Sequence, residues 1–193
     1  MIRKKSHCEE NEPLLESILS MLRFMKITRH IPKNSKILDL GCGYNAIFAK
    51  RINNNCKYVG LDISININTN INNATLIEHD LNKSLPFNNN TFDVVTSLAN
   101  LEHLQSPNAM IKEIHRVLNP GGILLLTTPS IWSKPVLEFL SFKLHLISKQ
   151  EIMDHKNYFN KKILEEYCEK SNFSYYKHNY FQLFMNNFLY AKE

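Results

Sequence analysis

The sequence predicts an α/β fold, in which helices cover both faces of a doubly wound, mostly parallel sheet of seven strands and an antiparallel C-terminal hairpin forms one edge. Short apolar runs alternate with segments of helical periodicity, a pattern typical of parallel strands buried on both faces. A glycine turn, Gly41-Cys42-Gly43, directly follows the first of these runs. The last two runs are joined by only a few residues, so they must pair antiparallel. The 193 residues, of which 44% are hydrophobic, are enough for one domain with its own core.

Each element is predicted from its local residue pattern. Helices are expected where apolar residues recur three and four positions apart, as at Met110, Ile111 and Ile114. Strands are expected at short apolar runs such as Ile123-Leu124-Leu125-Leu126, and Asn119-Pro120-Gly121-Gly122 just before that run predicts a turn. The predicted strands cover residues 36–40, 58–61, 75–78, 92–97, 123–128, 173–180 and 184–191, and the predicted helices cover 13–29, 46–52, 107–118, 134–147 and 161–171.

The composition excludes several classes of protein. The four cysteines are widely scattered with no C-x-x-C pair, so we expect reduced thiols in a cytoplasmic protein, not a disulfide scaffold or a metal finger. No apolar run approaches the roughly 20 residues of a membrane-spanning helix. A polar stretch follows the basic residues 3–5, where a signal peptide needs an apolar one. The net charge of +5 permits an anionic partner without requiring one.

Acidic residues stand at the ends of three successive predicted strands. Asp39 lies two residues before Gly41, Asp62 ends the second strand, and Asp80 follows the third. We expect Asp39 to point toward the glycine turn, where it would repel a pyrophosphate and attract an ammonium group. This charge favours S-adenosylmethionine, which carries an ammonium and a sulfonium but no phosphate, over NAD. Asp62 lies 21 residues after Gly41, about the offset at which an acidic residue binds ribose hydroxyls in nucleotide-binding folds.

Several runs of residues occur in a fixed order along residues 34–130. The first four are Ile37-Leu38-Asp39-Leu40-Gly41-Cys42-Gly43, Val59-Gly60-Leu61-Asp62, His79-Asp80-Leu81 and Phe92-Asp93-Val94-Val95. Together they resemble successive motifs of the class I S-adenosylmethionine-dependent methyltransferases, whose fold is Rossmann-like. Leu101-Glu102-His103-Leu104, Arg116-Val117-Leu118-Asn119-Pro120-Gly121-Gly122 and Thr128-Pro129-Ser130 resemble the small-molecule branch called methyltransferase type 11. The resemblance weakens beyond residue 130.

The resemblance implies a site for S-adenosylmethionine, with S-adenosylhomocysteine as the product. The residues expected to bind the cofactor are Asp39, Gly41, Cys42, Gly43, Asn45, Asp62, Ile63, Asp80, Leu81 and Ser97. Asp39 and the two glycines would line its methionine end, with Ser97 under the amino acid. Asp62 would hold the ribose, Ile63 would lie against the adenine, and Asp80 and Leu81 would read the adenine edge. Asn45 stands where the family commonly has a third glycine, and asparagine tolerates a left-handed backbone better than other non-glycine residues.

The resemblance also divides the single domain, residues 1–193, into four parts. These are a helical cap at 1–33, a cofactor-binding core at 34–130, an acceptor-pocket or lid insertion at 131–160, and a C-terminal helix and hairpin at 161–193. Residues 135–147 of the insertion are strongly apolar on a helix, which predicts a small-molecule acceptor with an apolar portion. A helix that packs on the sheet or at a dimer interface would show the same pattern. The oligomeric state, monomer or homodimer, is open.

His103 is the candidate catalytic base, and the alternative is that it packs at the start of a helix. It follows the fourth strand on the side of the sheet where the methyl group should emerge, and a histidine can accept a proton near neutral pH. We therefore prefer a hydroxyl acceptor on a sugar, a quinone or another metabolite. Related quinone and RNA-end methyltransferases bind a divalent ion at a similar Glu-His pair with a glutamate three residues earlier. Ala99 occupies that position here, so no metal is expected around Glu102, His103 and His155.

Three other functions remain open. A nucleic-acid methyltransferase is disfavoured, because Ser97-Leu98-Ala99-Asn100 replaces the Asn/Asp-Pro-Pro-aromatic motif of enzymes that flip a base, and because the basic residues are spread along the chain. A non-catalytic protein that binds S-adenosylmethionine would fit the change at Asn45, but it would have no reason to keep the acids and glycines. Gly41-x-Gly43-x-x-Ala46 also satisfies the dinucleotide fingerprint, yet Asp39 disfavours an NAD-dependent oxidoreductase.

Overall fold

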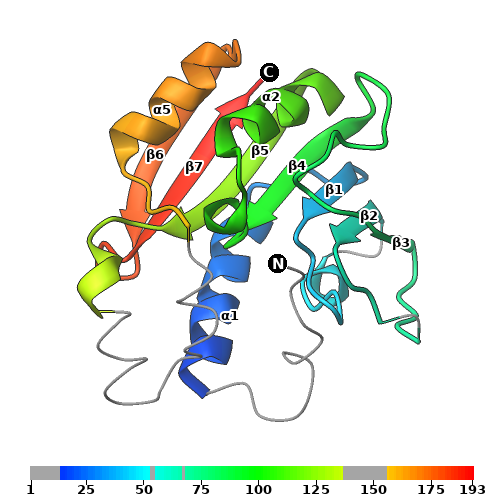
Figure 1. The fold of residues 1–193 in the computed structure, drawn as a ribbon. Coiled ribbons are helices and arrows are strands. Elements are labelled where there is room, and N and C mark those ends of the chain that lie inside the picture. The colour runs from blue at the N-terminus through cyan, green and yellow to red at the C-terminus, as the bar shows by residue number, and fades with distance from the viewer. Residues whose placement is uncertain (1–13, 53–54, 67, 137–155) are drawn as a thin grey trace.

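A seven-stranded sheet forms the centre of the molecule (Figure 1). The computed structural model describes residues 14–52, 55–66, 68–136 and 156–193. The strands are β1 (Lys36–Leu40), β2 (Lys57–Asp62), β3 (Ala74–Glu78), β4 (Phe92–Leu98), β5 (Leu118–Pro129), β6 (Tyr175–Phe181) and β7 (Asn186–Lys192), in the order β3-β2-β1-β4-β5-β7-β6. The first five strands are parallel, and β7 pairs antiparallel with both β5 and β6. The predicted sheet with its C-terminal edge hairpin is confirmed.

Helices cover the two faces of the sheet unequally. The α-helices are α1 (Leu14–Thr28), α2 (Pro107–Val117) and α5 (Lys161–Lys170), and the short 3₁₀-helices are η2 (Ala49–Arg51) and η3 (Leu101–His103). α2 and α5 pack on one face, where Ile111 and Leu164 join the core cluster of Leu38. α1 and η2 pack on the other face, where Ile27 lies in the cluster of Ile37. None of the helices within the described residues is long and apolar enough to cross a membrane.

The predicted helices at 13–29, 107–118 and 161–171 match α1, α2 and α5 within their described residues. The predicted helix at 46–52 is wrong. Residues 44–48 form turns, and Ala46 has a left-handed backbone with φ 44°, which a right-handed helix cannot contain. The chain is helical only over η2. Ala49, its first residue, and Phe48, just before it, are both buried. The predicted helix at 134–147 falls largely on residues outside the described ranges, which reach 136.

The predicted turn at 119–122 is instead a bulge within β5. Phe92 of β4 pairs with Leu118, and Val94 pairs with Ile123, so two steps on β4 face five on β5. Gly121 takes up the extra length with a left-handed φ of 76°. The glycines at this position therefore shape a strand rather than end one.

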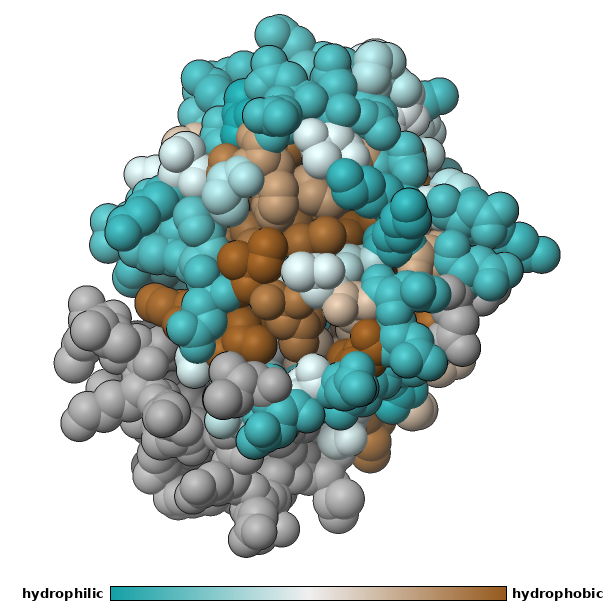
Figure 2. All heavy atoms as spheres, turned by 90° about the vertical axis from the view of Figure 1, so that its right-hand side faces the viewer, coloured by the Kyte–Doolittle hydropathy of each residue, from teal (hydrophilic) through white to brown (hydrophobic). Residues whose placement is uncertain are grey.

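The sheet is less completely wound than the alternation of elements suggests. β2 connects to β3, and β3 to β4, without a helix among the described residues 63–66, 68–73 and 79–91. Figure 2 shows the side of the molecule on which β2 and β3 lie, and there hydrophobic residues gather in the middle of a hydrophilic frame. The half-buried Val59 and Ile77 extend the core toward this side. The loops that follow β2 and β3 must therefore be held by contacts other than helix packing.

Candidate functional site

The carboxyl ends of four parallel strands meet at one rim of the sheet. Leu40 at the end of β1 pairs with Leu61 of β2 on one side and with Ser97 of β4 on the other. Asp62, the last residue of β2, pairs with Glu78 of β3. The residues predicted to bind a cofactor therefore lie along a single edge, at the position where open α/β sheets bind their ligands.

The glycine turn is tied to the end of β2. Gly41 and Gly43 both have left-handed backbones, with φ of 78° and 75°. The Gly41 N–H donates to the Leu61 carbonyl oxygen over 2.8 Å, and the Gly43 N–H donates to Asp62 Oδ2 over 2.9 Å. A Cβ atom built on Gly43 would meet no atom of the described residues within 4 Å. The turn is thus held from one side, while open space borders Gly43 on the other and leaves room for a ligand.

Asn45 serves the turn in a different way from the one predicted. Its backbone is not left-handed, and the left-handed residue is its neighbour Ala46. The Asn45 side chain instead accepts a hydrogen bond at Oδ1 from Asn66 Nδ2 over 3.0 Å, and the Asn66 N–H donates to the Tyr44 carbonyl oxygen over 2.9 Å. These two bonds join the glycine turn to the loop that follows β2.

Asp39 is buried in the middle of the sheet, where two hydroxyl groups contact it. Tyr58 Oη donates to Asp39 Oδ2 over 2.5 Å, and Thr96 Oγ1 donates to Asp39 Oδ1 over 2.6 Å. Burial raises the pKa of the Asp39 carboxyl to about 6, against the opposing effect of these two hydrogen bonds. Tyr58 and Thr96 were missed from the sequence, although parallel pairing of β1 with β4 sets Thr96 directly opposite Asp39.

Asp80 lies in a turn at the end of β3, while Ile63 and Leu81 differ in exposure. Asp80 Oδ1 accepts from both the backbone N–H and Nδ2 of Asn82, each over 3.0 Å, and these bonds lower the pKa of the Asp80 carboxyl. Leu81 is buried, whereas Ile63, just after Asp62, is exposed. Asn82 Oδ1 also accepts from the Gln105 N–H over 2.9 Å, which joins this turn to the residues that follow η3.

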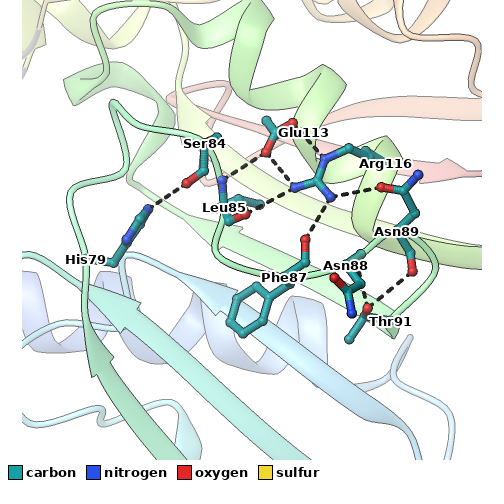
Figure 3. A network of polar contacts seen from close by, with 9 residues as sticks. All are labelled: His79, Ser84, Leu85, Phe87, Asn88, Asn89, Thr91, Glu113 and Arg116. Atoms are coloured by element: carbon teal, nitrogen blue, oxygen red, sulfur yellow. Dashed lines mark hydrogen bonds and ion pairs between the residues drawn. The ribbon is translucent and has the colours of Figure 1, made fainter.

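Arg116 of α2 holds the rest of the β3–β4 loop (Figure 3). Its Nη1 donates to the Phe87 carbonyl oxygen over 2.8 Å and to Asn89 Oδ1 over 3.0 Å, and its Nη2 donates to the Leu85 carbonyl oxygen over 3.2 Å. Nε and Nη2 each donate to a carboxylate oxygen of Glu113 over 2.8 Å, and Glu113 Oε2 accepts from the Leu85 N–H. All five N–H donors of the guanidinium are used, so this loop is attached to α2 in place of a helix of its own.

Buried polar atoms occur in the last residues of β4 and β5 and in the chain that follows β4. Those with no hydrogen-bond partner within the described part of the chain include Ser97 Oγ, Asn100 Nδ2, Glu102 Oε1 and Thr127 Oγ1. Glu102 is fully buried, its Oε2 accepts from Thr128 Oγ1 over 2.9 Å, and burial raises the pKa of its carboxyl. His103, the predicted base, is half-buried at the end of η3. Asn100 and Glu102 were not among the predicted cofactor or catalytic residues.

Metal-ligating groups do not gather at this rim in the part of the chain that the structure describes. No three His, Cys, Asp or Glu side chains come together there. His155, which we considered as a partner of Glu102 and His103, lies outside the described residues. The polar groups at this rim are the carboxyl groups, amides and glycine turn described above.

Comparison with known proteins identifies the family. A family model described as a methyltransferase domain matches residues 13–178. The chain belongs to this methyltransferase family. It is 30% identical over 121 residues to demethylmenaquinone methyltransferase of Staphylococcus epidermidis, and 32% over 130 residues to the ubiquinone/menaquinone biosynthesis C-methyltransferase UbiE of Neisseria meningitidis. These matches cover 58% and 61% of this chain, and 50% and 53% of the relatives, so the chain spans about half the length of the curated relatives it matches.

Solved structures of methyltransferases share the fold of the family member described here. An S-adenosylmethionine-dependent methyltransferase of Mesorhizobium loti has a TM-score of 0.68 at 16% identity, with 88% of this chain and 96% of that chain covered. Phosphoethanolamine N-methyltransferase 2 of Haemonchus contortus, in complex with S-adenosyl-L-methionine, also has a TM-score of 0.68 at 16% identity, with 89% and 52% covered. The predicted resemblance to the class I methyltransferases, the Rossmann-like fold and the cofactor of the family are confirmed.

We expect the substitution Asp39→Asn to change the pH dependence of stability. The Asp39 pKa is about 6 in the fold against 3.8 when unperturbed, so the folded protein binds an extra proton between these values. Stability from this group is then present below about pH 4 and is lost as pH rises through 6. An asparagine keeps an acceptor for Tyr58 and has no charge to lose. The free energy of unfolding of Asp39→Asn, minus that of the wild type, should rise by about 2 kcal/mol between pH 4.5 and 7.

Urea denaturation of both proteins across this pH range measures the difference, in which the titration of all other groups cancels. A difference that stays constant with pH would contradict the raised pKa of Asp39.

We expect Arg116→Ala to loosen the β3–β4 loop. It leaves two backbone carbonyl groups and the Glu113 carboxylate without their partner, which should cost about 2 kcal/mol of stability. Hydrogen exchange should rise most in residues 79–91. The control, Lys170→Ala, removes an exposed i,i+4 ion pair with Glu166 and should leave both measurements nearly unchanged. Faster exchange spread evenly over the sheet would show that Arg116 does not act on the loop.

Proposed function

We propose that this protein transfers a methyl group from S-adenosylmethionine to a small-molecule acceptor. The observation that carries the proposal is the rim itself. Asp39 lies on β1 two residues before the glycine turn, Asp62 ends β2 and accepts from the Gly43 N–H, and the turn borders open space at Gly43. Within the described residues neither acid forms an ion pair, and two unpaired acids favour a cationic, phosphate-free nucleoside over a dinucleotide. The family match supports the same cofactor.

The contacts at the rim support an assignment of each residue to the part of the cofactor that it would bind. Asp62 already binds Gly43 through Oδ2, which sets its carboxylate beside the turn for the ribose hydroxyls. Asp39, held by Tyr58 and Thr96, offers negative charge to the ammonium group of the methionine end. The remaining proposed cofactor contacts are those predicted from the sequence: Gly41, Cys42, Asn45, Ile63, Asp80, Leu81 and Ser97. Bound in this way, the cofactor supplies an electrophilic methyl group on a sulfonium.

His103 is proposed as the base that takes a proton from the acceptor. It lies at the end of η3, which begins three residues after the last residue of β4, and we propose that its ring faces a group placed over the rim. Loss of the hydroxyl proton of an aromatic ring makes both the oxygen and the adjacent ring carbon more nucleophilic. The cofactor would supply the methyl group as its carbon–sulfur bond breaks, leaving the sulfur as a neutral thioether. Removal of the hydroxyl proton by His103 is sufficient for transfer to oxygen, whereas transfer to carbon also requires the methylated ring carbon to lose its own proton to solvent.

A phenol or quinol with an apolar tail is the acceptor class we favour. The Staphylococcus and Neisseria relatives are named for menaquinone and ubiquinone synthesis. Beyond the end of β5, Trp132 is 62% exposed, and Lys134 Nζ lies 5.8 Å from the centre of the Tyr158 ring. We propose that Trp132 and Tyr158 form an aromatic wall on the acceptor side. A relative described as a tRNA methyltransferase of Arabidopsis thaliana, 34% identical over 109 residues, keeps RNA as the second candidate.

We expect S-adenosylhomocysteine to bind with a dissociation constant in the micromolar range, or about −7 to −8 kcal/mol. Asp62→Asn should weaken this binding by about 2 kcal/mol, since one oxygen can still accept from the Gly43 N–H while the charge that binds the ribose is lost. Isothermal titration calorimetry gives both values, with NADH as the control ligand. Absence of heat with S-adenosylhomocysteine, or tighter binding of NADH, would overturn the proposed function.

We expect His103→Gln to lower kcat by about 10²-fold or more while the dissociation constant of S-adenosylhomocysteine changes less than about twofold. Glutamine keeps a polar side chain of similar length but cannot take up the proton. Single-turnover methylation of a panel of phenols and quinols measures the rate. The same assay with RNA as the acceptor tests RNA, the second candidate. Unchanged turnover would remove His103 from the mechanism, and methylation of RNA alone would replace the proposed acceptor class.

A further inference from the structure

Asn100 buries an amide donor beside the glycine turn. The residue lies between β4 and η3 and is only 6% exposed. Its Nδ2 is buried and has no hydrogen-bond partner among the described residues. Leaving a buried donor without a partner costs about 1–3 kcal/mol, which a ligand that accepts from it would recover.

The amide lies directly against Gly41. A Cβ atom built on Gly41 would come within 2.6 Å of both Cγ and Oδ1 of Asn100, so the side chain fills the space that a larger residue in the turn would need. Gly41 follows β1, and β1 is the neighbour of β4 in the sheet. Three residues before Asn100, Ser97 is fully buried, and its Oγ is a second donor without a partner among the described residues. Two unused donors therefore flank the point where β1 and β4 end.

The chemistry of the cofactor's amino-acid end indicates what these donors are for. That end carries an ammonium and a carboxylate on the same carbon. Asp39 suits the ammonium, but Asp39 and Asp62 would both repel the carboxylate. A neutral amide N–H and a hydroxyl can donate to a carboxylate without cancelling the acidic character of the rim.

We propose that Asn100 is the residue that recognises the carboxylate of the cofactor's methionine end, with Nδ2 as the donor and Ser97 Oγ as a second donor. This inference rests on the proposed function and deepens it. Asn100 then makes the site selective for the full cofactor over nucleosides that lack the amino acid. The substitution that tests this role is Asn100→Asp, which keeps the size of the side chain, replaces the donor by an acceptor and adds a negative charge.

Two ligands separate recognition of the carboxylate from a general effect on the turn. S-adenosylhomocysteine has the amino acid, and 5′-methylthioadenosine has the same nucleoside and sulfur without it. By calorimetry, Asn100→Asp and Asn100→Ala should each raise the dissociation constant of S-adenosylhomocysteine about tenfold or more, with the larger rise for the aspartate. The dissociation constant of methylthioadenosine should stay within about twofold, and its binding also shows that each variant is folded.

Thr127→Val is the matched control, because it removes another buried hydroxyl without a partner among the described residues while keeping the shape of the side chain. It should leave both dissociation constants unchanged. Equal weakening of the two ligands by Asn100→Asp and Asn100→Ala, or no weakening of either, would overturn the role of Asn100 and leave the proposed function standing. A wild-type protein that binds neither ligand would overturn the proposed function and the inference with it.

Discussion

A carboxyl group buried at the centre of a sheet has to be paired, and the pairing of Asp39 organises the candidate site. Its two oxygens accept from Tyr58 on β2 and Thr96 on β4, so one side chain connects three adjacent strands just below their carboxyl ends. Burial still raises its pKa to about 6, which means that the two hydroxyls do not fully replace the water that Asp39 has lost. A cation placed over the rim would stabilise the charged form. The residue that costs stability in the free protein is thus the one that a cationic ligand would favour.

The sequence predicts most of the framework because the framework depends on local patterns. Strands such as Lys36–Leu40 are short and apolar, and α2 begins at Pro107, whose ring suits the first turn of a helix. The predictions fail where backbone conformation depends on distant contacts. Residues 46–52 have the composition of a helix, but the chain there must turn to bury Phe48 and Ala49, and Ala46 is left-handed. Position 46 is an alanine, a residue type that does not predict a left-handed backbone.

The candidate site could be predicted at its acids and glycines, but its supporting residues could not be. Asp39, Gly41, Gly43 and Asp62 follow from their places at strand ends. Tyr58 and Arg116 act through hydrogen bonds to parts of the chain 19 and 29 residues away, which only the fold brings together. The loop between β3 and β4 has no helix that could pack on the sheet, and the hydrogen bonds of Arg116 hold the loop in place of such a helix. A guanidinium with all five donors in use makes this loop part of α2.

The two halves of the rim are held in place by different kinds of contact. On the proposed cofactor side, strand ends and the glycine turn that is bonded to β2 hold the polar groups in place. On the proposed acceptor side, the chain at 156–159 is attached to η3 and to the end of β5 by its backbone and by the Asn157 side chain, whose Nδ2 donates to the Leu104 carbonyl oxygen over 3.0 Å. The Lys156 and Asn157 N–H groups donate to the Glu102 carbonyl oxygen over 3.0 and 3.2 Å, and Ser130 pairs with Phe159. Because the bonds of Lys156, Ser130 and Phe159 use main-chain groups, they do not depend on the side chains at these positions. The same bonds hold Glu102, whose buried carboxylate also accepts from Thr128 Oγ1, directly before the proposed base His103 at the end of η3.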